Sequence, residues 1–290
     1  MVTRAGSIAV VVAAAGWAAL AQLQAAEGQP APARNGAVSL AAHRAVYDLK
    51  LAATRGKQTM ESVRGRILYD FSGNACEGYA LQFRQVSELD SGEGKVTVSD
   101  LRATSWEDGA GRRLRFHSQN YFDQELRDAV DGQAERAADG IAVRLTKPTE
   151  KSLAFKTELL FPTEHVRRII AAAREGKTLL QVAIYDGSDS GEKIYDTLTV
   201  IGRPIAPNEQ APSDALAGQP AFAKLTRWPV TVSYFDRGAA AEGGEQTPVY
   251  AIKFELYENG VSRALRLDYG NFVLSGEITS IEMKDTKPCP

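Results

Sequence analysis

The sequence predicts a mainly β fold, either a large curved antiparallel sheet or an open barrel, with one main helix. Three observations predict this fold class. Apolar and polar residues alternate along most of the chain after about residue 40, as they do in strands with one buried face. Short clusters rich in Gly, Asp and Ser separate these segments. One stretch near the middle has the apolar spacing of a helix.

The composition is that of an ordinary globular protein. The 290 residues are 44% hydrophobic and 24% charged, which is enough for one large domain with a sizeable core. The formal net charge is −2, so the chain lacks the basic field that holds nucleic acid. The basic run Arg112-Arg113-Leu114-Arg115 is too short and too mixed with acids to change that conclusion.

The first residues, 1–21, are predicted to be a cleavable signal peptide. Arg4 supplies a weak positive charge, and Ile8 to Leu20 form an apolar run of the length typical of a signal-peptide core. Ala19-Leu20-Ala21 has the small-x-small form of a cleavage site, and cleavage after Ala26 is the later alternative. A transmembrane anchor is the other interpretation, but the run is shorter than the roughly 20 residues that span a bilayer.

The remaining chain is predicted to hold a disordered lead-in, residues 22–38, and one β-rich domain, residues 39–290. The lead-in is rich in Pro, Ala and Gly. In an exported protein, the two cysteines Cys76 and Cys289 favour a disulfide that closes a very long loop. The alternative is a redox or nucleophilic cysteine, but the sequence has no C-x-x-C motif and no His near either cysteine.

Six clearly alternating segments precede the helical stretch. They read "HRAVYDLKL", "SVRGRILYDF", "GYALQFRQV", "KVTVSDLRATSW", "RLRFHSQNYF" and "GIAVRLTK". Turn clusters separate them, among which we count Asp131-Gly132 and Asp139-Gly140. Strands at this spacing with Gly-rich turns indicate antiparallel hairpins and meanders.

The main helix is predicted at about Thr163–Glu175. Thr163 is a plausible N-cap, and Gly176 is a suitable stop after the last turn. Val166, Ile169, Ile170 and Ala173 share one face, so we expect the helix to lie on the sheet or to plug its end.

Two strands follow the helix, "KTLLQVAIYD" and "EKIYDTLTVIG". The stretch from Arg203 to Phe222 contains four prolines and no period, so we expect a long surface loop or lid. The last block is all strand: "WPVTVSYF", "TPVYAIKFELYENG", "SRALRLDYG" and "FVLSGEITSIEMK". The chain therefore has about a dozen expected strands.

The segment "GSDSGE" between the two strands after the helix resembles a reactive or metal-binding loop. Asp189-Ser190-Gly191 is the pattern around some nucleophilic serines, but the second Gly and the G-x-S-x-G elbow are missing. The oxygens of Asp186, Ser188, Asp189, Ser190 and Glu192 are only part of a calcium ligand set. The favoured interpretation is the tip of a hairpin.

No catalytic residue, metal site or cofactor is expected. The three histidines, His43, His117 and His165, lack metal-ligand spacing, and His165 is expected to pack or cap. The carboxylate pairs Asp123 with Glu125 and Glu107 with Asp108 are interpreted as solvated residues beside turns. No phosphate loop, dinucleotide fingerprint or zinc motif occurs in the sequence.

Aromatic residues recur within the alternating strands. They form either an ordinary core or the lining of an interior cavity, because a large curved sheet encloses more space than its side chains fill. The candidate lining residues are Tyr47, Tyr69, Phe71, Tyr79, Phe83, Phe116, Tyr234, Tyr250 and Phe254.

Four features in order resemble the EipB family of periplasmic cell-envelope integrity proteins. They are "LLFPTEHVRRII", "IYDGSDSGEKIYDTLTVIG", "WPVTVSYFD" and the distant pair Cys76 and Cys289. The resemblance covers about Leu40 to Cys289, and only the Pro-rich stretch Arg203 to Phe222 has no clear counterpart.

This resemblance implies a β-spiral, a broken open barrel of antiparallel strands with a helix near the opening. It also implies a disulfide between Cys76 and Cys289 and a role in envelope stress resistance. The family brings no catalytic residues. Its shape is similar to that of lipoprotein-carrier half-barrels, which suggests an apolar ligand.

Two functions follow as hypotheses. The first is a non-enzymatic periplasmic scaffold that contacts other periplasmic or envelope proteins. The second is a carrier or sensor of an apolar ligand, such as a lipid, a lipopeptide or a peptidoglycan fragment. A homodimer is a further expected partner arrangement, and no nucleic acid is expected. A hydrolase that uses Ser190 is the third and least favoured reading.

Overall fold

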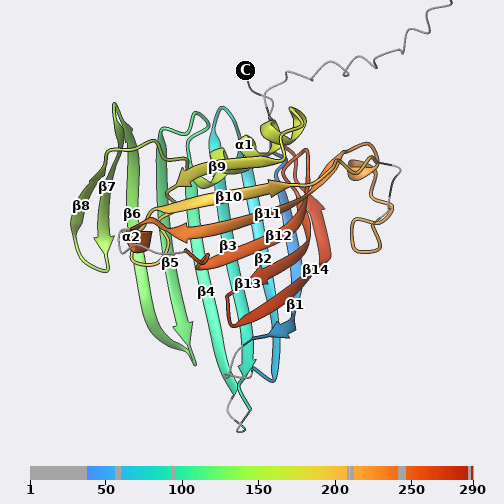
Figure 1. Ribbon diagram of the computed structural model, residues 1–290, viewed down its shortest axis with the longest axis horizontal. Coiled ribbons are helices and arrows are strands. Elements are labelled where there is room, and N and C mark those ends of the chain that lie inside the picture. Colours follow the sequence, from blue (N-terminus) through green and yellow to red (C-terminus); the bar gives the residue numbers. More distant parts are fainter. Residues whose placement is uncertain are drawn as a thin grey trace, which may run out of the picture. The chain divides into compact units, whose positions relative to one another are not determined.

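Fourteen antiparallel strands form one sheet in the computed structural model, in the order β8-β7-β6-β5-β4-β3-β2-β1-β14-β13-β12-β11-β10-β9 (Figure 1). The structure describes residues 38–55, 60–92, 94, 96–207, 209, 212–240, 246–286 and 289. The predicted signal peptide lies outside these residues, as does nearly all of the predicted lead-in.

The strands of the first arm are β1 (His43–Thr54), β2 (Ser62–Asn74), β3 (Gly78–Asp90), β4 (Val96–Glu107), β5 (Arg113–Phe122), β6 (Glu125–Ala137), β7 (Gly140–Lys147) and β8 (Lys151–Phe155). Those of the second arm are β9 (Leu179–Ile184), β10 (Tyr195–Ile201), β11 (Arg227–Asp236), β12 (Tyr250–Tyr257), β13 (Ser262–Asp268) and β14 (Phe272–Met283). The helices are α1 (Pro162–Arg174), the short α2 (Arg237–Ala240) and the 3₁₀ turn η1 (Pro220–Phe222).

The two arms meet where β1 pairs with β14. Successive hairpins run outward from this seam, so β8 and β9 become the two edges and do not pair with each other. In Figure 1 the second arm crosses in front of the first arm, so the sheet curls over itself without closing. The predicted fold class, an open barrel of antiparallel strands with one main helix, is therefore confirmed.

One face of the curled sheet holds the core, as the alternation predicted. On β1, Ala45, Tyr47 and Leu49 are buried while Arg44 and Lys50 are exposed. The inward residues of β1, β2, β13 and β14 share one cluster. Where the arms overlap, inward residues of β2 and β3 share a second cluster with those of β11 and β12.

The strand β6 shows where a turn prediction was wrong. Asp131-Gly132 lies inside β6, at a bulge in its pairing with β7. A Cβ on Gly132 would lie 2.8 Å from Cζ of Phe116. The glycine is therefore present because an aromatic ring on the neighbouring strand needs its space, and not because the chain turns.

Helix α1 spans Pro162–Arg174, close to the predicted Thr163–Glu175, and packs on β2, β3 and β11 through Ile169 and Ile170. Its N-cap is Phe161 and not Thr163, because Pro162 takes the first helical position. The cap comes instead from Glu107, whose carboxylate accepts the N–H groups of Thr163 and Glu164. Gly176 ends the helix with φ +73°, as predicted.

The described part of the Pro-rich stretch Arg203 to Phe222 is the predicted surface loop, and a few buried apolar side chains anchor it to the core. The side chains of Leu216 and Phe222 are only 1% and 5% exposed and belong to the core cluster around β1 and β14. Ala215 donates its N–H to the carbonyl of Ile278 on β14. The sequence did not predict these two buried residues, because apolar residues without a regular spacing give no helix or strand signal.

Within the described residues, no helix is long and apolar enough to cross a membrane.

Candidate functional site

The nine candidate lining aromatics share the inward face of the sheet. Directly paired residues point to the same side of a sheet, and Tyr69 pairs with Phe83 while Tyr234 pairs with Tyr250. The other members occupy β1, β2, β3, β5 and β12. Strands far apart in the sequence therefore present their rings to one interior.

The rings form two ladders across the strands. On one arm, His43, Tyr69, Phe71 and Tyr79 follow one another at centroid distances of 5.5, 6.2 and 5.4 Å. On the other arm, Tyr195, Tyr234, Tyr250, Tyr269 and Phe272 follow at 6.3, 5.7, 5.2 and 5.0 Å. Aromatic pairs at such distances stabilise packing by about 0.5–1.5 kcal/mol each.

The rings themselves fill part of this interior. Tyr47, Phe71, Tyr79 and Phe116 are buried, and the other five rings are half-buried. A cavity of about 90 Å³ remains beneath α1, lined in part by Tyr69, Phe71 and Tyr79. This is smaller than the roughly 300–1,000 Å³ typical of sites for drug-sized ligands.

Several inward tyrosines keep polar groups at this interior. The hydroxyls of Tyr69, Tyr234 and Tyr250 make no hydrogen bond to any residue that the structure describes, whereas Tyr47 donates to the carbonyl of Ser262 at 2.8 Å. Burial raises the pKa of Tyr69 to about 12 and also raises that of Tyr234, so both stay neutral phenols that can donate a hydrogen bond.

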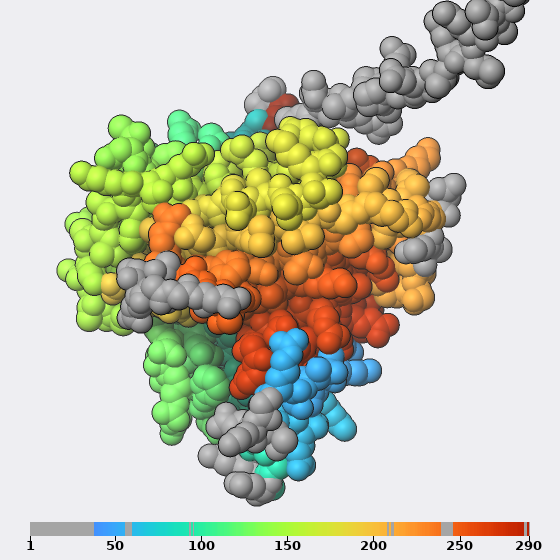
Figure 2. Space-filling model, viewed as in Figure 1, coloured from blue at the N-terminus to red at the C-terminus, as the bar shows by residue number. Residues whose placement is uncertain are grey.

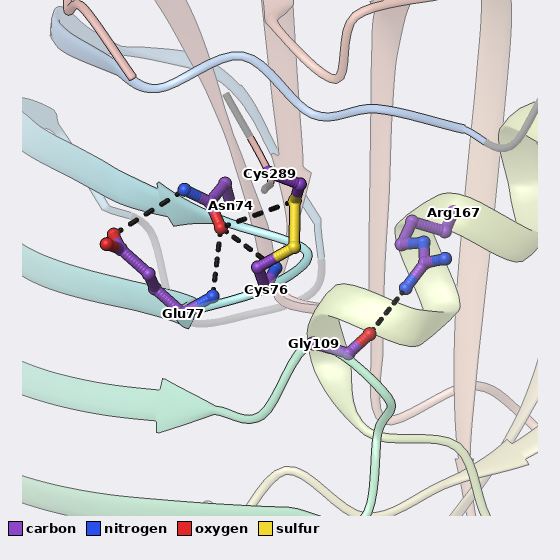
Figure 3. The surroundings of a disulfide bond; sticks show 6 residues. All are labelled: Asn74, Cys76, Glu77, Gly109, Arg167 and Cys289. Carbon is purple, nitrogen blue, oxygen red and sulfur yellow. Dashed lines mark hydrogen bonds between the residues drawn. A yellow bond between two sulfur atoms is a disulfide. The ribbon is translucent and has the colours of Figure 1, made fainter. Parts of the chain in front are cut away.

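The disulfide between Cys76 and Cys289 joins the C-terminal end to the turn between β2 and β3 (Figure 3). Asn74 organises this turn, because its side-chain oxygen accepts the N–H groups of Cys76 and Glu77 at 2.8 and 2.9 Å. No cysteine in the described chain is free.

The disulfide turn is also connected to α1. The turn between β4 and β5 packs so closely on it that a Cβ on Gly109 would lie 1.8 Å from the carbonyl oxygen of Ala75. The carbonyl of Gly109 in turn accepts a hydrogen bond from Arg167 on α1 at 3.0 Å (Figure 3). The C-terminal end, two turns and the helix therefore form one connected cap.

The loop that contains Ser190 is more than a hairpin tip. It does join β9 to β10, which pair as a hairpin. However, Gly187 lies against the ring of Phe116, and Gly191 lies against Leu145 and Val130 of the opposite arm. The buried Tyr185 donates to the carbonyl of Gly191 at 2.7 Å. The loop thus packs into the inner face of β5, β6 and β7.

The polar residues of this loop have structural partners. Asp186 accepts the N–H of Ser188 at 2.9 Å, Asp189 accepts the hydroxyl of Tyr195 at 2.5 Å, and Glu192 pairs with Lys151. Among the residues that the structure covers, no group of three His, Cys, Asp or Glu is arranged to hold a metal ion.

The three imidazoles pair with groups other than Ser190. His43 contacts the carbonyl of Ala41 at 2.8 Å, and His165 is buried against Thr197 with 3.5 Å between Nε2 and Oγ1. His117 contacts Asp131 at 2.9 Å. Burial lowers the pKa of His165 to about 4, which suits the packing role expected for it.

Glu107 was wrongly interpreted as a solvated residue. Its side chain is 3% exposed because it lies under the first turn of α1. Burial raises its pKa to about 7, against the effect of the two N–H groups that it accepts. The residues of the other pair fit the interpretation: Asp123 lies in the turn between β5 and β6, and Glu125 is exposed.

Sequence reasoning missed two surface features. One is the edge of β9, where Leu179 and Val200 are 59% and 46% exposed. The other is a groove across the outward face of β4 to β7 that contains Trp106, Arg115 and Arg144. Both consist of outward positions in alternating strands, and such positions indicate a site only when the strand register is known.

Comparison with known proteins agrees with this architecture. The model of the EipB-like family matches residues 34–285. The chain belongs to the EipB-like family.

One EipB-like relative is the cell envelope integrity protein EipB of Brucella abortus (strain 2308). It is 36% identical over 250 residues, which cover 86% of each protein. A crystal structure of a beta-barrel-like protein of a domain of unknown function from Brucella abortus has a TM-score of 0.78 and 34% identity. That match covers 86% of this chain and 100% of the solved chain.

Proposed function

We propose that this EipB-like protein supports the integrity of the cell envelope from the periplasm, by binding a partner protein and not by catalysis. The name of its Brucella relative supports the envelope role. The contacts of the three histidines with groups other than Ser190 support a non-enzymatic role, because a nucleophilic serine needs a base held beside it. N-terminal sequencing of protein from the periplasm should find the chain beginning after Ala21 or Ala26.

The edge of β9 carries the proposal. In β9, the carbonyl of Ala183 points away from β10 and accepts the N–H of Leu160, and the N–H of Tyr185 donates back to Leu160. By alternation, the N–H and carbonyl of Gln181 point to the same side, away from β10. No backbone hydrogen bond to a described residue uses them. An open strand edge is a template for a strand from another chain.

Apolar side chains lie beside this edge. Leu179 and Val200 are directly opposite each other on β9 and β10 and are both exposed. A groove of about 510 Å³ continues from them across the outward face, with Leu198 and Phe235 in its lining. Figure 2 shows this face of the molecule, where the yellow and orange segments of the second arm are turned toward the viewer.

The occupant that fits is an extended segment of another envelope protein. Its backbone would pair with Gln181, and every second side chain would be apolar and would cover Leu179 and Val200. Burial of these two side chains would contribute on the order of 2–4 kcal/mol, which suits a specific but reversible contact.

A photo-crosslinking residue placed at Leu179 in living cells tests this mode. We expect a defined crosslinked partner that is weakened by Val200→Asp and by Gln181→Pro, which removes the edge N–H. Val96→Asp is the matched control, because Val96 is 53% exposed on β4. Equal crosslinking in Val200→Asp and Val96→Asp would contradict the docking site.

The carrier function remains the second candidate, and the three inward phenols favour it. The hydroxyls of Tyr69, Tyr234 and Tyr250 have no hydrogen-bond partner in the described part of the chain, which suits a ligand that is apolar along its length and has polar groups at intervals. Native mass spectrometry of protein released gently from envelopes would then show an added mass. A bare polypeptide mass under those conditions would count against the carrier.

A further inference from the structure

The outward face of β4, β5, β6 and β7 carries a groove of about 520 Å³ that none of the roles discussed above uses. Its walls include Trp106, Arg115, His117, Asp131, Arg144 and Thr146. The volume lies within the roughly 300–1,000 Å³ range of small-ligand sites.

The register arranges these side chains in two rows across the strands. In the first row, Trp106 pairs with Arg115, Arg115 with Gln133, and Gln133 with Arg144. In the second row, Thr104 pairs with His117, and His117 with Asp131. Strands lie about 4.8 Å apart, so the α-carbons of Arg115 and Arg144 are about 10 Å apart with Gln133 between them.

The two arginines of the first row differ from their neighbours on the same face. Arg84 and Arg102 both bind Asp100, and Arg113 pairs with Glu135. Arg115 and Arg144 have no carboxylate within ion-pair distance among the described residues. The groove therefore holds two guanidinium groups without an ion pair to a described carboxylate, on a sheet face where the neighbouring arginines are paired.

Trp106 holds one of these cations in place. The guanidinium carbon of Arg115 lies 5.5 Å from the centre of the Trp106 ring. The ring itself packs on Gly78, where an added Cβ would lie 2.8 Å from the ring atom Cζ2. A stacked guanidinium keeps its hydrogen-bond donors at the ring's edge, where an anion can reach them.

The second row offers groups of the opposite kind. Asp131 accepts the hydroxyl of Thr146 at 2.8 Å and contacts Nδ1 of His117 at 2.9 Å. The hydrogen bond from Thr146, followed by the one from His117, lowers the pKa of Asp131, so this carboxylate stays ionised. Each oxygen keeps a further lone pair, and Nε2 of His117 has no hydrogen bond to a described residue.

We propose that this groove binds an oligosaccharide that carries acidic groups, either carboxylate, phosphate or sulfate. The two guanidinium groups would bind the acidic substituents, and Asp131, His117 and Gln133 would bind sugar hydroxyls. The combination of free cations with a fixed carboxylate matches a ligand that has both acid groups and hydroxyl donors. An acidic peptide fits less well, because it brings no row of hydroxyl donors for Asp131 and the paired strands offer it no backbone groups.

Calorimetry with the full mature protein tests the site. The probes are a heparin-derived tetrasaccharide, neutral maltotetraose, and a hexaglutamate peptide. We expect the tetrasaccharide to bind, and the double variant Arg115→Gln, Arg144→Gln to lose at least tenfold in affinity. Arg64→Gln is the control, because Arg64 is exposed on the same outward face at β2 and has no ion pair with a described residue.

Three results would overturn the site: no binding by the unaltered protein, equal losses in the double variant and in Arg64→Gln, or tighter binding of hexaglutamate. Circular dichroism and thermal melting confirm that the variants fold.

A second variant separates a saccharide site from a simple anion site. Asp131→Asn should weaken the tetrasaccharide about tenfold and leave the weaker binding of inorganic sulfate unchanged or slightly stronger. A parallel loss for sulfate and tetrasaccharide would mean that sugar hydroxyls are not recognised, and it would overturn the proposal. Maltotetraose should bind at least tenfold more weakly than the acidic tetrasaccharide, and equal binding would also contradict it.

Discussion

The carboxylate of Glu107 accepts the backbone N–H of Thr163 at 2.7 Å, and so caps α1 from a position 56 residues earlier in the chain. A second N–H, from Glu164, reaches the same carboxylate at 2.9 Å. The helix thereby takes its N-terminal cap from β4, since Phe161 at the N-cap position makes no side-chain cap bond. This contact fixes the helix to the first arm of the sheet.

The Glu107 cap should make stability depend on pH. Burial raises its pKa in the folded protein to about 7 from 4.5. Between these values the folded chain keeps a proton that the unfolded chain has lost, so the free energy of unfolding falls as pH rises through this window. Glu107→Gln should remove that fall, which is at most about 3 kcal/mol at 1.4 kcal/mol per pH unit. Urea unfolding at pH 5 and pH 8 measures it.

His165 on the same helix should act in the opposite direction. Burial lowers its pKa in the folded protein to about 4 from 6.5, so the unfolded chain holds more protons between these values. Its contribution therefore rises with pH and offsets that of Glu107. We expect a shallow pH profile for the unaltered protein, a rising one for Glu107→Gln and a falling one for His165→Gln. Stability profiles with the same slope against pH in both variants would contradict these opposite effects of Glu107 and His165.

Removal of the disulfide should destabilise the protein without removing a reactive group. Cys76 and Cys289 are 213 residues apart, and the cross-link restricts the unfolded chain over that whole length. We expect Cys289→Ser to lower the free energy of unfolding by about 2–5 kcal/mol. The double variant with Cys76→Ser should match the single variant. A double variant that is clearly more stable than the single one would show that the free thiol itself is harmful.

Most of the strands and the helix could be predicted from local sequence pattern, but the contacts between distant segments could not. Alternation located the strands with one strongly apolar face, yet the polar β6 and the short β8 passed unnoticed. A helix signal gave α1 within one residue at each end. The cap by Glu107 depends on which turns meet in space, and no periodicity in one chain contains that information.

The surface features were harder to predict than the core. Inward aromatic residues can be predicted from the sequence, because the buried face of a strand places apolar side chains at every second position. Arg115 and Arg144 are separated by 28 residues of ordinary polar sequence, and only the pairing of both with Gln133 brings them together. Their lack of carboxylate partners among the described residues could not be inferred before those neighbours were known.

The Pro-rich segment should behave as an anchored surface loop and not as a lid. Leu216 is 1% exposed, so Leu216→Ala should cost about 2–5 kcal/mol through lost burial and an unfilled cavity. Leu126→Ala on β6, where the side chain is 51% exposed, is the matched control and should change stability little. Limited proteolysis should leave the segment intact in the unaltered protein. Rapid cleavage in this segment, with no loss of stability in Leu216→Ala, would support the lid interpretation instead.

The loop between β9 and β10 should matter for its glycines and not for its serine. A Cβ on Gly187 would lie 2.4 Å from Cδ2 of Phe116, and its φ of +71° also disfavours a side chain. Gly176→Ala isolates the backbone cost, because Gly176 has φ +73° and nothing within 4 Å of an added Cβ. That cost is about 1 kcal/mol.

We expect Gly187→Ala to lower the free energy of unfolding clearly more than Gly176→Ala does, because the added methyl group forces the loop away from the ring of Phe116. Ser190→Ala should change the free energy of unfolding by less than about 0.5 kcal/mol and leave envelope resistance in cells intact. Faster amide hydrogen exchange of residues 185–194 in Gly187→Ala would show that the loop has moved away from Phe116. If Ser190→Ala abolished resistance while the fold stayed intact, the serine would have a chemical role, and the binding function proposed for this protein would fail.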